Sequence, residues 1–162
     1  MPEARQPAGE HLRLKNSVKA IVVEGGRLLV LKKKGVDRPF YVLPGGTQRP
    51  GETLADALVR EVREEVGAAV KVGDLKHVRD YIARHHEFAR EQAGLHRVEF
   101  WFECRLLERP GTVLQTEPDR RQVGVEWLAV QDLAACPLYP RALKDILLGE
   151  RKDAPVYLGD VN

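Results

Sequence analysis

The 162-residue sequence contains only two cysteines, Cys104 and Cys136, which lie far apart and lack metal-ligand spacing. This scarcity argues against a disulfide framework and against a zinc site built on cysteine pairs. We expect both side chains to be buried or half-buried thiols in a reducing cytosol. A disulfide between the two is the alternative that the sequence leaves open.

Long apolar runs are also absent. No segment approaches the ~20 apolar residues that a membrane span needs. The first residues, MPEARQPAGEHLRLKNS, contain no apolar core of the kind found in a signal peptide. The sequence therefore predicts a soluble, cytoplasmic protein with no membrane partner.

An excess of charge of one sign is missing as well. The chain has 26 Lys and Arg residues against 24 Asp and Glu residues, a formal net charge of +2. This balance gives no argument for nucleic acid as a partner, and we expect none. The 43% hydrophobic and 31% charged composition is typical of one globular domain that is large enough to bury a core.

Apolar segments separated by turn residues predict several strands. Gly25 and Gly26 divide one apolar stretch and suit a tight hairpin turn. Further strands are expected at 40–43, within 70–82, at 98–107 and at 124–130.

Two helices are expected between these strands, at 53–66 and 140–148, with a long charged connection at 83–97. Strands interleaved with helices favour an α/β fold, a mixed sheet covered by helices. We expect a single domain over 14–150, preceded by a flexible arm at 1–13 and followed by a tail at 151–162.

The helix expected at 53–66 combines an apolar stripe with crowded acidic side chains. Helical spacing places these residues on the stripe: Leu54, Ala55, Leu58, Val59, Val62 and Val66. Glu61 and Glu65 then lie one turn apart at its edge, where like charges oppose helix formation. Arg60 and Arg63 do not obviously neutralise these groups together with Glu52 and Glu64, whereas a hard divalent ion such as Mg²⁺ would. The alternative is an exposed helix face of mixed charge.

Gly45 and Gly46 lie between a strand and this helix. A backbone without Cβ atoms can approach a ligand closely, and a loop carbonyl there could complete a metal site with the helical carboxylates. A simple tight turn is the alternative.

The stretch 46–68, GTQRPGETLADALVREVREEVGA, resembles the signature of the Nudix family. The matching positions are Gly46, Glu52, Arg60, Glu61, Val62, Glu64, Glu65 and Gly67. The last position, Ala68, is smaller than the usual branched aliphatic residue, which weakens a packing contact and not the chemistry.

The resemblance implies a Nudix α/β/α sandwich, with a mixed β-sheet flanked by helices. It implies metal ligands at Glu61, Glu64, Glu65 and the Gly45 carbonyl, with Mg²⁺ as the cofactor and Mn²⁺ as an alternative. Glu64 is either a further ligand or a base acting through water.

The resemblance also implies catalytic roles for Arg60, which orients the glutamates, and for Glu52, which holds that arginine or a metal-bound water. Glu61 and Glu64 complete the expected catalytic set. Gly46 is expected to lie against the substrate.

The resemblance also implies a further acidic residue outside the signature, in the loop before the last strand, with Glu117, Asp119 and Glu126 as candidates. Arg84 and Arg97 in the charged connection are candidates for binding phosphates, or else solvated surface charges.

The same connection contains His85, His86 and His96, but their spacing does not support a zinc site. We expect them in a polar loop over the mouth of the site. In the strand at 98–107, one of Trp101 and Phe102 is expected in the core.

Together these features predict a pyrophosphohydrolase that cleaves the diphosphate of a nucleoside diphosphate linked to another group, with water attacking phosphorus in line. The partner is then a small-molecule nucleotide, and a homodimer is left open. Two alternatives are a nucleotide sensor without turnover and an RNA 5′-end pyrophosphohydrolase. The positions downstream of the signature, Ala83 to His85, carry neither the proline of ADP-ribose hydrolases nor the tyrosine of diadenosine polyphosphate hydrolases.

Overall fold

The computed structural model describes residues 13–112 and 120–162. Its strands are β1 (Arg13–Ile21), β2 (Val23–Glu24), β3 (Arg27–Lys33), β4 (Phe40–Val42), β5 (Gly45–Thr47), β6 (Val70–Ile82), β7 (Leu95–Leu106), β8 (Gln122–Ala129), β9 (Leu138–Tyr139) and β10 (Tyr157–Asp160). Its α-helices are α1 (Leu54–Val66), α2 (Ala89–Gln92) and α3 (Arg141–Leu147), with 3₁₀ turns at Ala83–His85 and Val130–Ala135. No helix in these two stretches is long and apolar enough to cross a membrane.

The strands form two mixed sheets, whereas the sequence had suggested one. The first has the order β10-β6-β7-β1-β5, in which β1 is parallel to β7 and β10 is parallel to β6. In the second, β3 pairs antiparallel with β2, β4 and β8, and β9 joins β4 in parallel. The chain leaves the first sheet at Ile21 and enters the second at Val23, so one nearly continuous extended run serves both.

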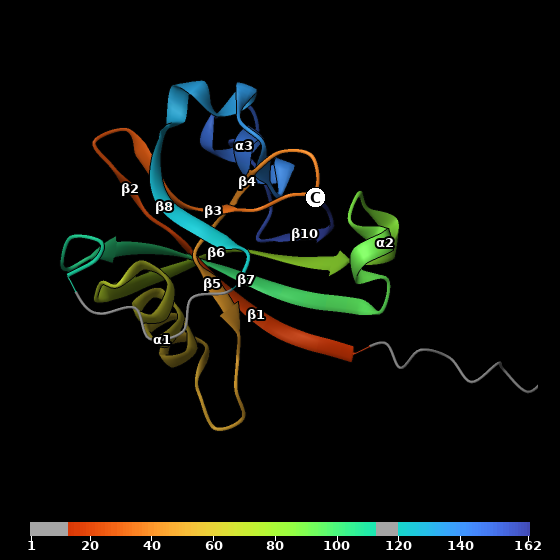
Figure 1. Ribbon diagram of the computed structural model, residues 1–162, viewed down its shortest axis with the longest axis horizontal. Helices are drawn as coiled ribbons and strands as arrows, with labels where there is room; N and C mark the ends of the chain where they lie inside the picture. Colours follow the sequence, from red (N-terminus) through yellow and green to blue (C-terminus); the bar gives the residue numbers. More distant parts are fainter. Residues whose placement is uncertain (1–12, 113–119) are drawn as a thin grey trace, which may run out of the picture.

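The two faces of these strands bury separate groups of side chains. Alternate residues of β3 show the division, because Leu29 and Leu31 pack toward α1 while Leu28 and Val30 pack toward the α3 side. Figure 1 shows α1 and α3 on opposite sides of the strands. Trp101, fully buried, belongs to the group on the α3 side, and Phe102 packs on the other. The predicted α/β class with helices flanking mixed sheets is confirmed.

Helix α1 begins and ends where the sequence predicts. Thr53 caps its N-terminus in a reciprocal pair with Asp56, and Gly67 ends it in the left-handed conformation at φ 69°. The buried face is rotated from the predicted stripe, however. Ala57 is buried, while Ala55 is exposed and Val59 is 41% exposed. The rotation occurs because Glu65 turns inward and is buried with the apolar side chains.

The two ends of the predicted domain need correction. Strand β1 already begins at Arg13, inside the expected arm. The segment 151–162, expected to be a tail, contains β10, which pairs with β6. The pairing of this segment was hidden in the sequence because it depends on a distant strand. The charged connection at 83–97 is shorter than expected, since β7 begins at Leu95.

Candidate active site

Strand β5 brings the loop backbone against α1. Gly45 lies opposite Lys19 of β1, and its amide donates a 3.0 Å hydrogen bond to Oε2 of Glu65. A Cβ atom at Gly45 would lie 1.9 Å from the carbonyl oxygen of Val18, and the backbone there has φ 140°. Only glycine fits at this position, so the sequence of the loop determines its contact with the helix.

Gly46 provides the corresponding space for Glu61. A Cβ atom there would lie 2.5 Å from Cδ of Glu61 and within 2.7 Å of both carboxylate oxygens. The hydroxyl of the buried Ser17 donates to the Gly46 carbonyl at 3.2 Å, which holds the loop from the other side. The two glycines therefore seat two helical carboxylates against bare backbone.

Arg60 lies at the centre of the acidic group. Its guanidinium donates to both oxygens of Glu52, at 2.5 and 3.0 Å, and to the carbonyl of Thr47 at 3.1 Å. It also donates to Glu61 at 2.8 Å and more weakly to Glu64 at 3.4 Å. These hydrogen bonds lower the pKa of Glu52 to about 2, with Arg60 the largest cause. The pKa of Arg60 is raised above its usual value by the same contacts.

Glu65 lies deeper than the other carboxylates, with 7% of its surface exposed. Burial raises its pKa to about 7, although Lys19 and the Gly45 amide act in the opposite direction. Burial likewise lowers the pKa of Lys19, whose positive charge is favoured by Glu99 and Glu65. The positive charge of Lys19 therefore interacts both with Glu65 of the signature helix and with a second acidic residue, Glu99.

A cavity of about 110 Å³ lies beside Lys19 and Glu99, and both side chains form part of its wall. The lining residues are Lys19, Phe40, Val42, Leu43, Arg79, Tyr81, Phe88, Glu91, Gln92, Arg97, Glu99, Arg121, Tyr139, Pro140 and Asn162. Three of the rings form a cluster, with centroids 5.5 Å apart for Phe40 and Phe88 and 5.2 Å for Phe88 and Tyr139. The wall therefore combines flat apolar surfaces with several cations.

Two arginines of the cavity wall, Arg79 and Arg97, differ in whether their guanidinium nitrogens have hydrogen-bond acceptors. Arg79 is 5% exposed and donates through Nε to Oε2 of Glu99 at 2.7 Å, so its charge is matched by a buried carboxylate. The Nε of Arg97 is buried without a hydrogen-bond partner among the described residues. Because a buried guanidinium donor without an acceptor is costly, Arg97 is suited to bind an anionic group of a ligand.

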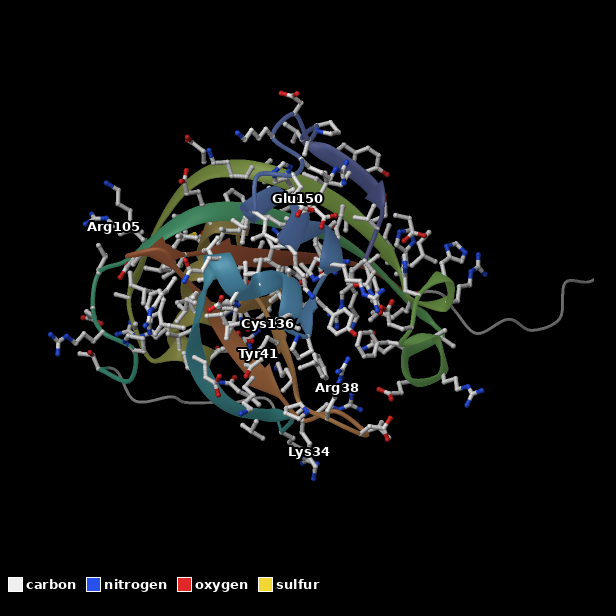
Figure 2. All side chains as sticks on the ribbon, turned by 90° about the horizontal axis from the view of Figure 1, so that it is seen from above. Lys34, Arg38, Tyr41, Arg105, Cys136 and Glu150 are labelled. Carbon is white, nitrogen blue, oxygen red and sulfur yellow. The ribbon has the colours of Figure 1, made fainter. Side chains whose placement is uncertain are left out.

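The cavity continues outward into a second hollow that shares Phe40, Phe88 and Tyr139 in its wall. Lys34 and Arg38 also line this hollow and are both exposed. Figure 2 shows Lys34 at the edge of the molecule. Lys34 therefore lies beside the second hollow as an exposed cation.

The signature carboxylates fit a hard divalent ion by their chemistry. Glu61, Glu64 and Glu65 are oxygen donors on one helix, and Glu61 and Glu65 lie against the bare backbone of the two glycines. Within 13–112 and 120–162, no three His, Cys, Asp or Glu residues already converge as a metal site. The reason is visible in the hydrogen bonds, since Arg60 draws Glu61 and Glu64 to itself while the Gly45 amide holds Glu65.

The candidates outside the signature have different positions. Glu117 and Asp119 lie outside the described residues. Glu126 accepts a hydrogen bond from the Tyr41 hydroxyl at 3.0 Å and pairs with Lys32 at 3.2 Å, on the second sheet. Arg84 is exposed and does not line the cavity, in contrast to Arg97.

The three histidines pair with aspartates. His85 and His86 contact the two oxygens of Asp160, at 2.7 and 2.6 Å, and His96 contacts Asp80 at 2.7 Å. The two cysteines are free thiols, with Cys104 buried and Cys136 half-buried, as expected.

Comparison with known proteins agrees with this geometry. The NUDIX domain profile matches residues 13–147, which is most of the chain. The chain belongs to the Nudix hydrolase family. Members of this family generally use divalent metal ions.

Among its relatives, the putative nudix hydrolase 1 of Caenorhabditis elegans is 32% identical over 108 residues, covering 67% of this chain and 26% of that protein. This chain therefore spans about a quarter of the length of the nematode protein. Nucleoside triphosphatase NudI of Salmonella agona is 29% identical over 141 residues, covering 84% of this chain and all of that protein. A crystal structure of a MutT Nudix hydrolase from Burkholderia pseudomallei superimposes with a TM-score of 0.64 at 27% identity, covering 85% of this chain and 97% of that one.

Several cavity residues of this Nudix protein escaped the sequence analysis, above all Lys19, Arg79 and Glu99. A signal was present for two of them, because Lys19 lies between Val18 and Ala20, and Glu99 lies between Val98 and Phe100. Charges at such positions are rarely buried unless they are paired. Their pairing across β1, β6 and β7 could be recognised only after the strands were aligned.

Proposed function

We propose that this Nudix hydrolase cleaves the diphosphate of a nucleoside diphosphate linked to another group, with Mg²⁺ as its cofactor and Mn²⁺ as a substitute. The observation that carries the proposal is the Arg60 network, which gathers Glu52, Glu61 and Glu64 beside the glycine backbone. The name of the Salmonella relative, a nucleoside triphosphatase, supports a nucleotide as the substrate.

Glu61, Glu64, Glu65 and the Gly45 carbonyl would hold the metal. When bound, such an ion supplies charge neutralisation of the diphosphate and a lowered pKa for its water. Binding requires Glu61 and Glu64 to exchange contacts with Arg60 for contacts with the ion. Their present contacts with Arg60 hold both carboxylates on the side of α1 that faces the loop.

Arg60 and Glu52 are positioning residues in this proposal. The two-point pair with Glu52 fixes the plane of the guanidinium, and the Thr47 carbonyl holds its remaining edge. Arg60 can then orient Glu61 and Glu64 from a constant position on α1. In this proposal Glu64 accepts a proton from the attacking water, directly or through a second water.

The reaction exchanges one phosphorus–oxygen bond for another. Water adds in line to one phosphorus, the bond to the bridging oxygen breaks, and the leaving phosphate takes the electron pair. The products are a nucleoside monophosphate and a phosphorylated remainder, with the proton of water passing to Glu64 and then to solvent. Positioning and charge stabilisation account for most of the rate in such transfers.

The cavity beside Lys19 is the proposed site for one of the two groups that flank the diphosphate. The ring cluster offers a surface on which a base can stack. In this proposal the diphosphate would pass Gly46, where the backbone carries no Cβ atom. Arg97 offers an unmatched donor for a phosphate or another anion.

A nucleotide panel with Mg²⁺ tests this proposal. The panel should contain nucleoside triphosphates, nucleotide sugars and a 5′-triphosphate RNA, with products identified by chromatography. We expect monophosphate release that is abolished by EDTA and restored by Mg²⁺. Glu64→Gln should lower turnover by at least about 100-fold, with Glu150→Gln as the surface control.

Other outcomes of the panel distinguish the alternatives. Nucleotide binding without turnover would support a sensor and contradict the proposal. Turnover confined to the triphosphate RNA would support an RNA 5′-end enzyme instead.

A further inference from the structure

The segment 156–162 lies along β6 at the edge of the cavity. Strand β10 pairs in parallel with β6, and the Val78 amide donates to the Val156 carbonyl at 2.7 Å (Figure 1). Asn162, at the end of the segment, lines the cavity together with Arg79. The first sheet thus gains an edge strand, and Asn162, two residues beyond the end of β10, forms part of the proposed substrate site.

Asp160 holds this segment in place through three donors. His85 and His86 each contact one of its oxygens, and the Ile82 amide donates to Oδ1 at 3.1 Å. Partial burial acts to raise the pKa of Asp160, but the hydrogen bonds from the two histidines lower it to about 2. One carboxylate therefore connects the segment to both the end of β6 and the turn that follows.

Arg79 connects the segment to the charges beside the signature helix. Its Nη1 donates to the Val161 carbonyl at 2.6 Å, while its Nε donates to Glu99. Glu99, 3% exposed, interacts with Lys19, and Lys19 interacts with Glu65. A continuous chain of polar contacts and charge interactions therefore leads from the segment to a proposed metal ligand.

Asn162 connects the segment to Glu87, in the connection between β6 and β7. Its Nδ2 donates to Glu87 at 2.7 Å, and its Oδ1 accepts a longer 3.4 Å contact from Arg79. The amide is thereby held between a cation and a carboxylate at the wall of the cavity. Loss of the segment would remove this wall and leave the Nη1 of Arg79 without its backbone acceptor.

From these contacts we infer that residues 156–162 are a positioning element of the substrate cavity, with Asp160 as the anchor and Asn162 as a determinant of which group the cavity accepts. The inference rests on the proposed function, because it assigns the cavity to the substrate. Asp160 acts through the segment and does not touch the reacting atoms.

The test compares Asp160→Asn with Asp153→Asn in the full chain. Asp153 is exposed three residues before the segment, and its side chain makes no hydrogen bond or ion pair with the described residues, so it controls for the loss of charge. We expect Asp160→Asn to increase amide hydrogen exchange at 156–162 and to raise KM for the accepted nucleotide about fivefold or more. The value of kcat should change less than twofold, and Asp160→Glu should restore part of the affinity.

A second variant, Asn162→Ala, tests the wall directly. It should change the ratio of kcat/KM values between two nucleotides of the panel, while exchange at 156–160 stays close to that of the wild type. Unchanged exchange in Asp160→Asn overturns its role as the anchor, whether or not the enzyme turns over. Increased exchange with an unchanged KM, measured on a wild type that is active, overturns the role of the segment. A wild type without turnover contradicts the proposed function instead.

Discussion

Arg60 and Glu52 form a two-point ion pair, with Nε 2.5 Å from Oε1 and Nη2 3.0 Å from Oε2. Glu52 precedes α1 and Arg60 lies in its middle, so the pair ties the loop to the helix. Both side chains are about four-fifths buried, which protects the contact from solvent screening. The geometry of the site depends on this pair because Arg60 holds two of the proposed ligands.

Arg60→Lys should therefore lower activity strongly while the stability of α1 changes little. A lysine ammonium cannot contact both oxygens of Glu52 and the Thr47 carbonyl in one plane. We expect kcat/KM to fall about 10- to 100-fold with a small loss of thermal stability. Arg63→Lys is the matched control, since Arg63 is exposed on the same helix. Equal losses in both variants would argue against a specific role for Arg60.

Gly46→Ala tests the seat of Glu61. The added methyl group would lie 2.5 Å from Cδ of Glu61, so the carboxylate must move. We expect at least about a 100-fold loss of turnover and a weaker response to Mg²⁺. Gly124→Ala is the control, because a Cβ atom at Gly124 meets nothing within 4 Å. Activity near the wild-type level in Gly46→Ala would show that Glu61 does not need this position.

Glu65→Gln should raise the stability of the metal-free protein and lower its activity. The unfolded carboxyl ionises near pH 4.5, whereas burial raises the pKa in the folded protein to about 7. Ionised Glu65 therefore costs stability, beginning above pH 4.5 and reaching its full size above pH 7. With EDTA present at pH 8, we expect the glutamine variant to be more stable, by on the order of 3 kcal/mol.

The same variant should lose most turnover and the increase in melting temperature caused by Mg²⁺. Glu150→Gln is the control, and Figure 2 shows Glu150 at the surface. Urea unfolding between pH 4 and 8 provides the measurement. A wild-type stability advantage that grows toward pH 8 in EDTA would contradict the prediction.

Arg97→Ala tests the unmatched donor of the cavity. Since Nε of Arg97 is buried without a partner, its removal should stabilise the free protein or leave it unchanged. Binding should weaken, with KM raised about tenfold and kcat little affected. Arg105→Ala, on the same strand but exposed, is the control. If KM is the same in both variants, Arg97 does not contact the substrate.

The sequence by itself was sufficient for the signature helix. Its cap at Thr53 and its end at Gly67 depend on local geometry, which nearby residues determine. The family resemblance and the α/β class follow from the same local pattern. The one local error, the exposure of Ala55 and Val59, arose because periodicity treats Glu65 as a surface residue.

Only the tertiary structure decided how the charged residues outside the signature are used. Lys19, Arg79 and Glu99 lie on three strands, and their interactions depend on the register of β1, β6 and β7. Residues 156–162 resembled a tail because their partners, from Val78 to His86, are about 75 positions away. Contacts at that separation leave no periodic trace in a sequence, because they depend on the path of the whole chain. The structure of the signature helix is therefore determined by residues close together in the sequence, whereas the cavity beside it is determined by the pairing of distant strands.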